Sequence, residues 1–145
     1  MKIKLITISK NESAAVEELF TDYTKRLKHY TTLEIIQLKP SSLKDEATAI
    51  LKKLSSDDEL ILLDEKGKEF TTVAFSSFLQ KKMNASRNLC FVIGSAYGFD
   101  DDLKKKSSTL ISLSKMTLPH LLAKVIFAEQ LYRAFTVLKN EKYHH

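Results

Sequence analysis

The chain has 145 residues, 43% of them hydrophobic and 28% charged, which is an ordinary globular balance and suits one domain spanning 1–145 with a buried core. No apolar run reaches the roughly 18–20 residues of a membrane span, and the opening MKIKLITISK lacks the apolar stretch of a signal peptide. The net charge of +5 leans weakly toward polyanions such as RNA. The single cysteine, Cys90, cannot form an intramolecular disulfide, so we expect a cytoplasmic, reducing setting.

Strand-like and helix-like patterns alternate along the whole chain. β-branched or continuously apolar runs indicate strands, and apolar residues at helical spacing indicate helices. In chain order the expected elements are a strand at Lys2–Ile8, a helix at Glu12–Tyr30, a strand at Thr32–Leu38, a helix at Lys44–Leu54, a strand at Glu59–Asp64, a helix at Thr71–Met83, a strand at Leu89–Gly94, a short charged helix, a strand at Thr109–Ser114, and a last helix from Leu118 or Pro119 to about Leu138. Ser41 and Ser42 are capping candidates for the second helix, and EKGK is expected to form a turn.

This alternation predicts an α/β fold with a mostly parallel sheet and helices on both faces. In such sheets a ligand binds beyond the carboxyl ends of the central strands. The rule selects three stretches, LDEKGK after the third strand, GSAYG after the fourth and SKMTLPH after the fifth.

The loop GSAYG holds two of the three glycines, Gly94 and Gly98. Glycine permits positive φ and lets a ligand approach the backbone. The spacing is neither the G-x-G-x-x-G of a dinucleotide site nor a phosphate-binding loop, so neither a Rossmann cofactor nor an NTPase is supported. A plain tight turn explains these glycines equally well.

The last helix is apolar over more than half of its circumference. A surface helix of a small domain shows one apolar stripe, so the excess requires a second covering surface. Either a symmetric partner subunit or a deeply buried position in the core would supply it. The four histidines lack the spacing typical of zinc ligands, and no metal site is expected.

Four blocks in order, LLDEKGKEF, FVIGSAYGF, SLSKMTLPHLLAKVIFAEQLYRAF and the terminal KYHH, resemble the ribosomal RNA large-subunit methyltransferase H family. These enzymes are the smallest of the SPOUT class, which uses S-adenosylmethionine. The resemblance covers the full length. It implies a C-terminal trefoil knot, a homodimer that packs through the knotted region, and N3-methylation of a pseudouridine in 23S ribosomal RNA of the assembled ribosome.

The resemblance also assigns residues to S-adenosylmethionine. By position they are Leu63, Gly94, Leu113, Ser114, Lys115, Met116, Thr117 and Leu118. The adenine is expected to lie against backbone and apolar atoms. These positions fall in the three stretches selected by sheet geometry. Lys115 is also compatible with a simple solvated charge.

One departure concerns the loop. Family members usually have Gly-Gly here, whereas Ser95 follows Gly94. We therefore expect Ser95 to adopt an ordinary backbone conformation, since a positive φ is costly for residues other than glycine. Tyr97 is expected either to offer a stacking face for a base or simply to pack.

The resemblance implies that the acceptor side of the reaction uses His120, Arg133, Tyr143 and His144 as catalytic residues. Each has a plainer explanation. His120 could cap or pack at the start of the last helix, Arg133 could pair with Glu129 four residues earlier, and the tail could be a frayed end. A catalytically silent ribosome- or RNA-binding module on the same fold is the alternative function, and a nucleotide-binding regulator would need a phosphate loop that the chain lacks.

Overall fold

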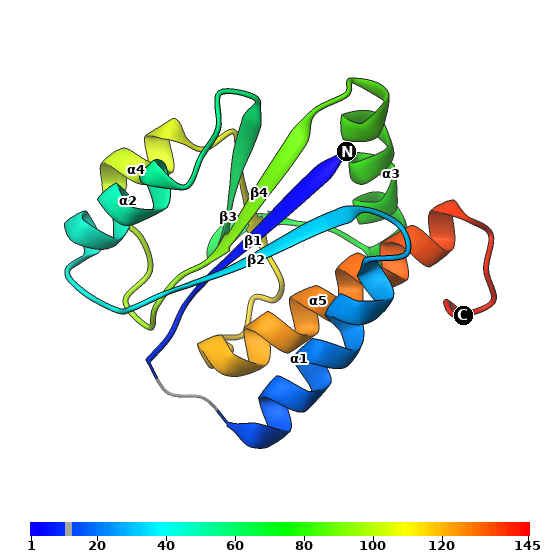
Figure 1. The fold of residues 1–145 in the computed structure, drawn as a ribbon, viewed down its shortest axis with the longest axis horizontal. Helices are drawn as coiled ribbons and strands as arrows, with labels where there is room; N and C mark the ends of the chain where they lie inside the picture. Colours follow the sequence, from blue (N-terminus) through cyan, green and yellow to red (C-terminus); the bar gives the residue numbers. More distant parts are fainter. Residues whose placement is uncertain (11–12) are drawn as a thin grey trace.

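The computed structural model describes residues 1–10 and 13–145. Within these residues, ten elements follow one another in strict alternation of strand and helix (Figure 1). They are β1 (Lys2–Ile8), α1 (Ala14–Leu27), β2 (Thr32–Leu38), α2 (Leu43–Lys52), β3 (Asp58–Glu69), α3 (Thr72–Asn84), β4 (Asn88–Ile93), α4 (Asp101–Lys106), β5 (Thr109–Ser112) and α5 (His120–Leu138). The expected start of the first helix at Glu12 lies outside the described residues.

The strands form one sheet in the order β2-β1-β4-β3-β5, and each neighbouring pair is parallel. The α/β prediction is therefore confirmed. β1, β4 and β3 are interior strands, which agrees with the apolar runs at ELILLD and LCFVIG. All carboxyl ends meet at one edge of the sheet, where the ligand rule places a site.

Helices cover both faces of the sheet and create two apolar clusters (Figure 1). One face packs against α1, α3 and α5, and the other against α2 and α4. Alternate residues of β1 enter alternate clusters, because successive strand side chains point to opposite faces. Thus Ile3 and Leu5 join the first cluster, and Ile6 and Ile8 join the second.

Local sequence explains where several helices begin. Ser42 Oγ accepts the backbone N–H of Asp45 at 3.1 Å and caps α2, which identifies the cap among the two serines considered. Thr71 caps α3 in the same way, with 3.1 Å from its hydroxyl to the N–H of Ala74.

The prediction that EKGK forms a turn after the third strand is wrong. Instead, β3 continues to Glu69 through a bulge. Leu63 and Lys68 both pair with Ile111, so the intervening residues are extruded from the ladder. Gly67 is required in this bulge, since a Cβ there would lie 2.6 Å from the backbone carbon of Leu110. Within the bulge, Glu65 and Lys66 are exposed.

Helix α5 is covered mainly within the chain. Phe127, Leu131 and Phe135 are buried in the cluster shared with α1 and α3. The core explanation for its wide apolar surface therefore accounts for most of it. Leu122 and Ile126, one helical turn apart, stay 49% and 37% exposed. The fifth strand and α5 are shorter than expected, because residues 113–119 form an irregular connection between them.

Candidate functional site

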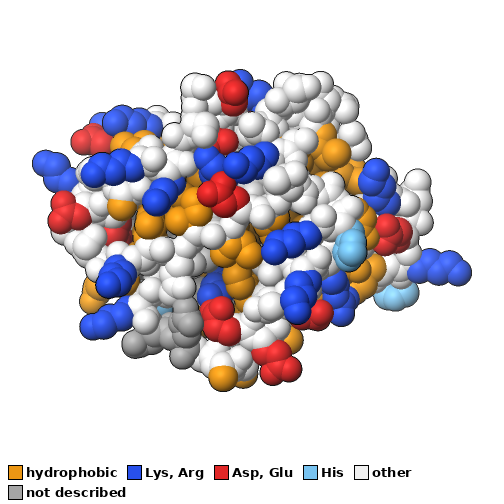
Figure 2. All heavy atoms as spheres, viewed as in Figure 1, with side chains coloured by type: hydrophobic (Ala, Val, Ile, Leu, Met, Phe, Trp, Pro, Cys, Tyr) orange, Lys and Arg blue, Asp and Glu red, His pale blue; other side chains and the backbone are white. Residues whose placement is uncertain are grey.

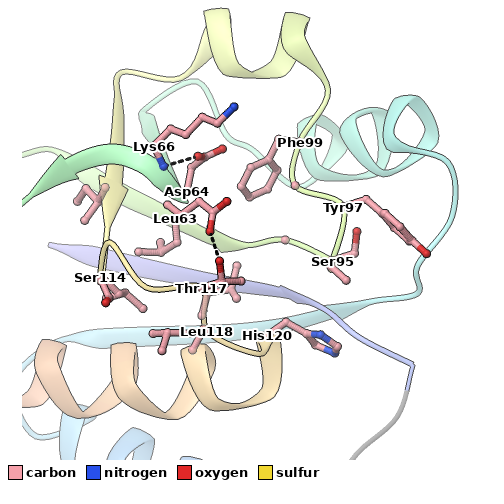
Figure 3. A pocket seen from close by; sticks show the side chains of 18 of the residues that line it. Leu63, Asp64, Lys66, Ser95, Tyr97, Phe99, Ser114, Thr117, Leu118 and His120 are labelled. Atoms are coloured by element: carbon pink, nitrogen blue, oxygen red, sulfur yellow. Dashed lines mark hydrogen bonds between the residues drawn. The ribbon is translucent and has the colours of Figure 1, made fainter.

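A pocket of about 330 Å³ lies beside the bulge of β3 and at the carboxyl ends of β4 and β5 (Figure 3). Its three walls are the bulge 64–66, the loop 94–99 and the connection 113–118, and His120 at the start of α5 adjoins them. These are the three stretches selected from sheet geometry. The pocket lies where residues 64–66 bulge out of β3 and where the chain leaves β5 without forming a helix at once.

The bulge wall begins with Leu63 and the carboxylate of Asp64. Asp64 accepts the backbone N–H of Lys66 at 2.8 Å, and its other oxygen lies 3.5 Å from Nζ of Lys104. This ion pair links the bulge to α4. Lys104 therefore also contributes to the lining of the pocket.

The loop wall is shaped by glycine and an aromatic ring. A Cβ at Gly94 would lie 2.9 Å from the ring of Phe99 and 3.1 Å from the carbonyl oxygen of Gly98, so any other residue here would force the loop to shift. Positive φ is needed at Gly98 (82°), whereas at Gly94 the requirement is the close approach.

Ser95 has an ordinary negative φ, as expected, and its hydroxyl donates to the buried carboxylate of Glu46 at 3.1 Å. Tyr97 is 86% exposed, which rules out the packing role considered for it.

The third wall is the connection between β5 and α5. Leu113, Ser114, Met116, Thr117 and Leu118 line the pocket. The Thr117 hydroxyl donates to Glu65 at 2.8 Å across the pocket mouth (Figure 3).

Lys115 alone among the expected cofactor residues does not line the pocket. Its side chain is 88% exposed, and its amine lies 3.8 Å from Glu69. The geometry therefore matches the solvated-charge explanation for this lysine.

The four expected acceptor-side residues separate into two places. His120 lines the pocket, whereas Arg133, Tyr143 and His144 gather at the far end of α5. Thirteen residues separate His120 from Arg133, which is about 20 Å along a helix. Within one chain the two groups do not form one site.

The cluster at the far end of α5 is tightly connected. Tyr143 donates its hydroxyl to Glu129 at 3.1 Å, and the guanidinium of Arg133 lies 4.6 Å from the centre of the Tyr143 ring. Arg133 also approaches Nδ1 of His144 at 3.4 Å. Burial, with hydrogen bonds to Tyr23 and Glu129, raises the pKa of Tyr143 well above its usual range, so this phenol stays protonated. The tail is thus not a frayed end.

Several of these contacts were invisible in the sequence. Glu46 and Ser95 are 49 positions apart, and Glu129 and Tyr143 are 14 apart with a chain reversal between them. The i,i+4 spacing did predict the pairing of Arg133 with Glu129, whose closest atoms are 2.6 Å apart. The chain reversal could have been predicted from Asn140, because asparagine tolerates the left-handed conformation that ends many helices.

Residues 1–10 and 13–145 contain neither a candidate metal site nor a candidate membrane helix. No three His, Cys, Asp or Glu side chains there are grouped so as to hold a metal ion. No helix in the same ranges combines the length and apolarity of a membrane crossing.

Comparison with known proteins gives a consistent result over the whole chain. A family model described as "Predicted SPOUT methyltransferase" matches residues 1–144. Proteins named ribosomal RNA large subunit methyltransferase H are similar to it throughout. That of Flavobacterium psychrophilum is 51% identical, with 100% of this chain and 99% of the relative covered. That of Cytophaga hutchinsonii is 44% identical with both fully covered, and that of Ruminiclostridium cellulolyticum is 37% identical with 99% of each covered.

Proposed function

The chain belongs to the SPOUT family of methyltransferases, and from that premise we propose that it transfers a methyl group from S-adenosylmethionine to N3 of a pseudouridine in 23S ribosomal RNA of the assembled ribosome. The observation that carries the proposal is the convergence of three strand-end stretches on one pocket. Its relatives are named for the large-subunit RNA, which supplies the substrate class.

The pocket has the size and lining expected of a cofactor site. Its volume of about 330 Å³ is in the range of ligand pockets, and apolar side chains are joined there by main-chain groups of irregular backbone. We assign Leu63, Leu113 and Leu118 to the faces of the adenine, and Gly94 to a close backbone approach. When bound, S-adenosylmethionine supplies an electrophilic methyl group on a sulfonium, whose leaving thioether is neutral.

The acceptor is the more demanding partner, because an N3–H imide is weakly acidic and its lone pair is delocalised. The protein must align that nitrogen and assist loss of its proton. His120 adjoins the pocket and is assigned to this side. Tyr143 is assigned to orienting the base by its ring and hydroxyl, because its raised pKa keeps the phenol protonated and leaves no phenolate to take the proton.

A second copy of the chain is required to bring Arg133, Tyr143 and His144 to a pocket, since about 20 Å of helix separates them from His120. We therefore propose a homodimer in which the tail of one chain completes the acceptor side of the other. The exposed pair Leu122 and Ile126 on α5 supports an interface along this helix. The trefoil knot stays a prediction from the family.

The ribosome is proposed to be recognised by shape as much as by charge. Figure 2 shows Lys and Arg side chains interspersed with Asp and Glu over the face that it draws. A face of mixed charge neutralises fewer RNA phosphates than a continuous basic patch would, so we assign shape a part in recognition. A ribosomal substrate in turn implies a cytoplasmic enzyme. Cys90 fits this setting as an unreactive core residue, because burial raises the pKa of its thiol to about 12.

Two measurements test the proposal. Calorimetry should detect S-adenosylmethionine binding with a dissociation constant on the order of micromolar. Mass spectrometry of 23S ribosomal RNA fragments from a deletion strain should then reveal one methyl group lost from a pseudouridine and restored by the gene. Ribosome binding without cofactor binding would instead support the catalytically silent module.

A further inference from the structure

The C-terminal tail, Lys139–His145, is turned back onto α5 by a defined helix end. Asn140 adopts the left-handed conformation with φ of 54°. The N–H of Glu141 bonds to the carbonyl of Thr136 at 2.9 Å, and that of Asn140 bonds to Val137 at 3.1 Å. These two bonds form a Schellman motif, which satisfies the last carbonyls of the helix and fixes the direction of the chain beyond it.

Two side-chain contacts then anchor the tail. The Tyr30 hydroxyl, from the turn that follows α1, donates to Glu141 at 2.7 Å. Further along, Tyr143 packs edge-on against Tyr132, with ring centres 4.8 Å apart, and donates its hydroxyl to Glu129. The second anchor, Tyr143, is itself one of the residues assigned to the acceptor.

Glu129 has more partners than a helical ion pair needs. Its Oε1 receives the Nε of Arg133 at 2.8 Å and the hydroxyl of Tyr143 at 3.1 Å. Its Oε2 receives the amide of Gln130 at 2.9 Å, and Gln130 in turn accepts the hydroxyl of Thr72 at 2.8 Å. The carboxylate is 16% exposed and is held from both sides. One oxygen therefore ties the helix residue Arg133 to the tail residue Tyr143.

We propose that Glu129 is a positioning residue that sets the tail for the acceptor base before RNA arrives. The inference rests on the proposed function, in which the tail serves the acceptor side. Without the carboxylate, Arg133 and Tyr143 lose their common acceptor. The tail then keeps the helix-end turn, the contact to Tyr30 and the packing of the Tyr143 ring against Tyr132 and Arg133, none of which fixes the Tyr143 hydroxyl. A displacement of about 1 Å in such a group is enough to slow a reaction by about a hundredfold.

A double-variant cycle measures whether Glu129 acts through the tail. Glu129→Ala should lower kcat for ribosome methylation about tenfold or more, with S-adenosylmethionine affinity unchanged. In a chain lacking Tyr143–His145 the same change should have no further effect, because the group it positions is gone. Full additivity of the two losses, or an unchanged kcat for Glu129→Ala, would overturn the proposal.

Two further variants separate positioning from folding. Glu129→Gln keeps the volume and one acceptor oxygen, so it should restore part of the rate. Asp22→Ala breaks a comparable i,i+4 pair with Arg26 on α1, where the closest atoms are 3.1 Å apart, and should leave kcat unchanged. A loss in Asp22→Ala equal to that in Glu129→Ala would indicate general destabilisation and contradict a specific role.

A test without catalysis examines the latch directly, where the latch is the hold of Glu129 on the tail through the Tyr143 hydroxyl. Carboxypeptidase should release His145 and His144 several times faster from Glu129→Ala than from the wild-type protein, with Asp22→Ala as control. Equal release rates would overturn the latch. An inactive wild-type enzyme whose tail Glu129 still protects would instead count against the proposed function and leave the latch supported.

Discussion

The two ends of α5 differ in how completely their hydrogen-bonding groups are satisfied within the chain. At its start, Pro119 precedes the helix and offers no side-chain acceptor, and the neighbouring Met116 is 77% exposed. At its end, the last carbonyls are satisfied by the Schellman turn, and Glu129 gathers Arg133 and Tyr143. A segment that receives a ligand leaves hydrogen-bonding groups available for it. A segment that presents side chains to another site needs its own bonds complete, so that those side chains arrive already oriented.

The largest expected effect separates the functions of the two ends. Removing Tyr143–His145 should reduce ribosome methylation about a hundredfold, because the acceptor base loses its orienting groups. S-adenosylmethionine affinity and dimer mass should be nearly unchanged, since the pocket is formed by other residues. Turnover at the wild-type rate would return the tail to the status of a dispensable end.

At the pocket end, Gly94→Val should weaken S-adenosylmethionine binding about tenfold or more, measured by calorimetry beside circular dichroism. The new side chain meets the Phe99 ring as well as the space assigned to the ligand.

Adding Phe99→Leu separates these two contacts, because it relieves the clash with the ring. Binding should stay weak in the folded double variant. Full recovery would mean that Gly94 serves the loop and not the ligand.

The middle of α5 connects both ends through the proposed dimer. Leu122→Lys with Ile126→Lys should weaken association about tenfold or more, because charges replace exposed apolar contacts. Light scattering should move from twice 16.6 kDa toward the single-chain mass. Leu19→Lys, at a comparably exposed position on α1, is the matched control. A stable wild-type monomer would contradict the dimer.

A smaller effect is expected where the loop meets α2. Ser95→Ala removes the hydroxyl bound to Glu46 and should weaken cofactor affinity about two- to fivefold. Ser95→Gly, which restores the residue usual in the family, tests whether the hydroxyl or the backbone matters. Equal affinity in all three proteins would show that the bond to Glu46 has no part in the pocket.

The smallest effect concerns the tail anchor at Tyr30. Burial first, and then the hydrogen bond to Glu141, raises the pKa of Tyr30 to about 12. A raised pKa favours the folded state at low pH, so this contribution is complete below the ordinary value of 10 and is lost as the pH rises toward 12.

Tyr30→Phe removes the hydrogen bond to Glu141, so it should lower the Tm by about 2 °C at neutral pH. Urea unfolding should show a shallower alkaline loss than in the wild-type protein. Tyr143, whose pKa is also raised, contributes a loss of the same sign to both proteins. If the stability of the two proteins falls in parallel at alkaline pH, Tyr30 does not contribute to the pH dependence.

The sequence by itself determined the layered fold and the edge that carries the pocket. The strands Lys2–Ile8 and Thr32–Leu38 were predicted with the bounds that the structure has, because a run of β-branched and apolar residues is a local signal. Parallel alternation then brings the ends of β3, β4 and β5 together whatever their side chains are.

Only the tertiary structure decided which distant residues meet. Lys4 alternates with apolar residues in its strand, a pattern that predicts an exposed side chain. It is nevertheless buried, and its amine forms an ion pair with Asp58 at 2.6 Å. The extrusion at Gly67 depends on how closely β5 approaches β3. Glu129 meets Tyr143 only because Asn140 reverses the chain. Such contacts depend on register and chain direction between segments, and a periodic pattern within one segment contains no information about either.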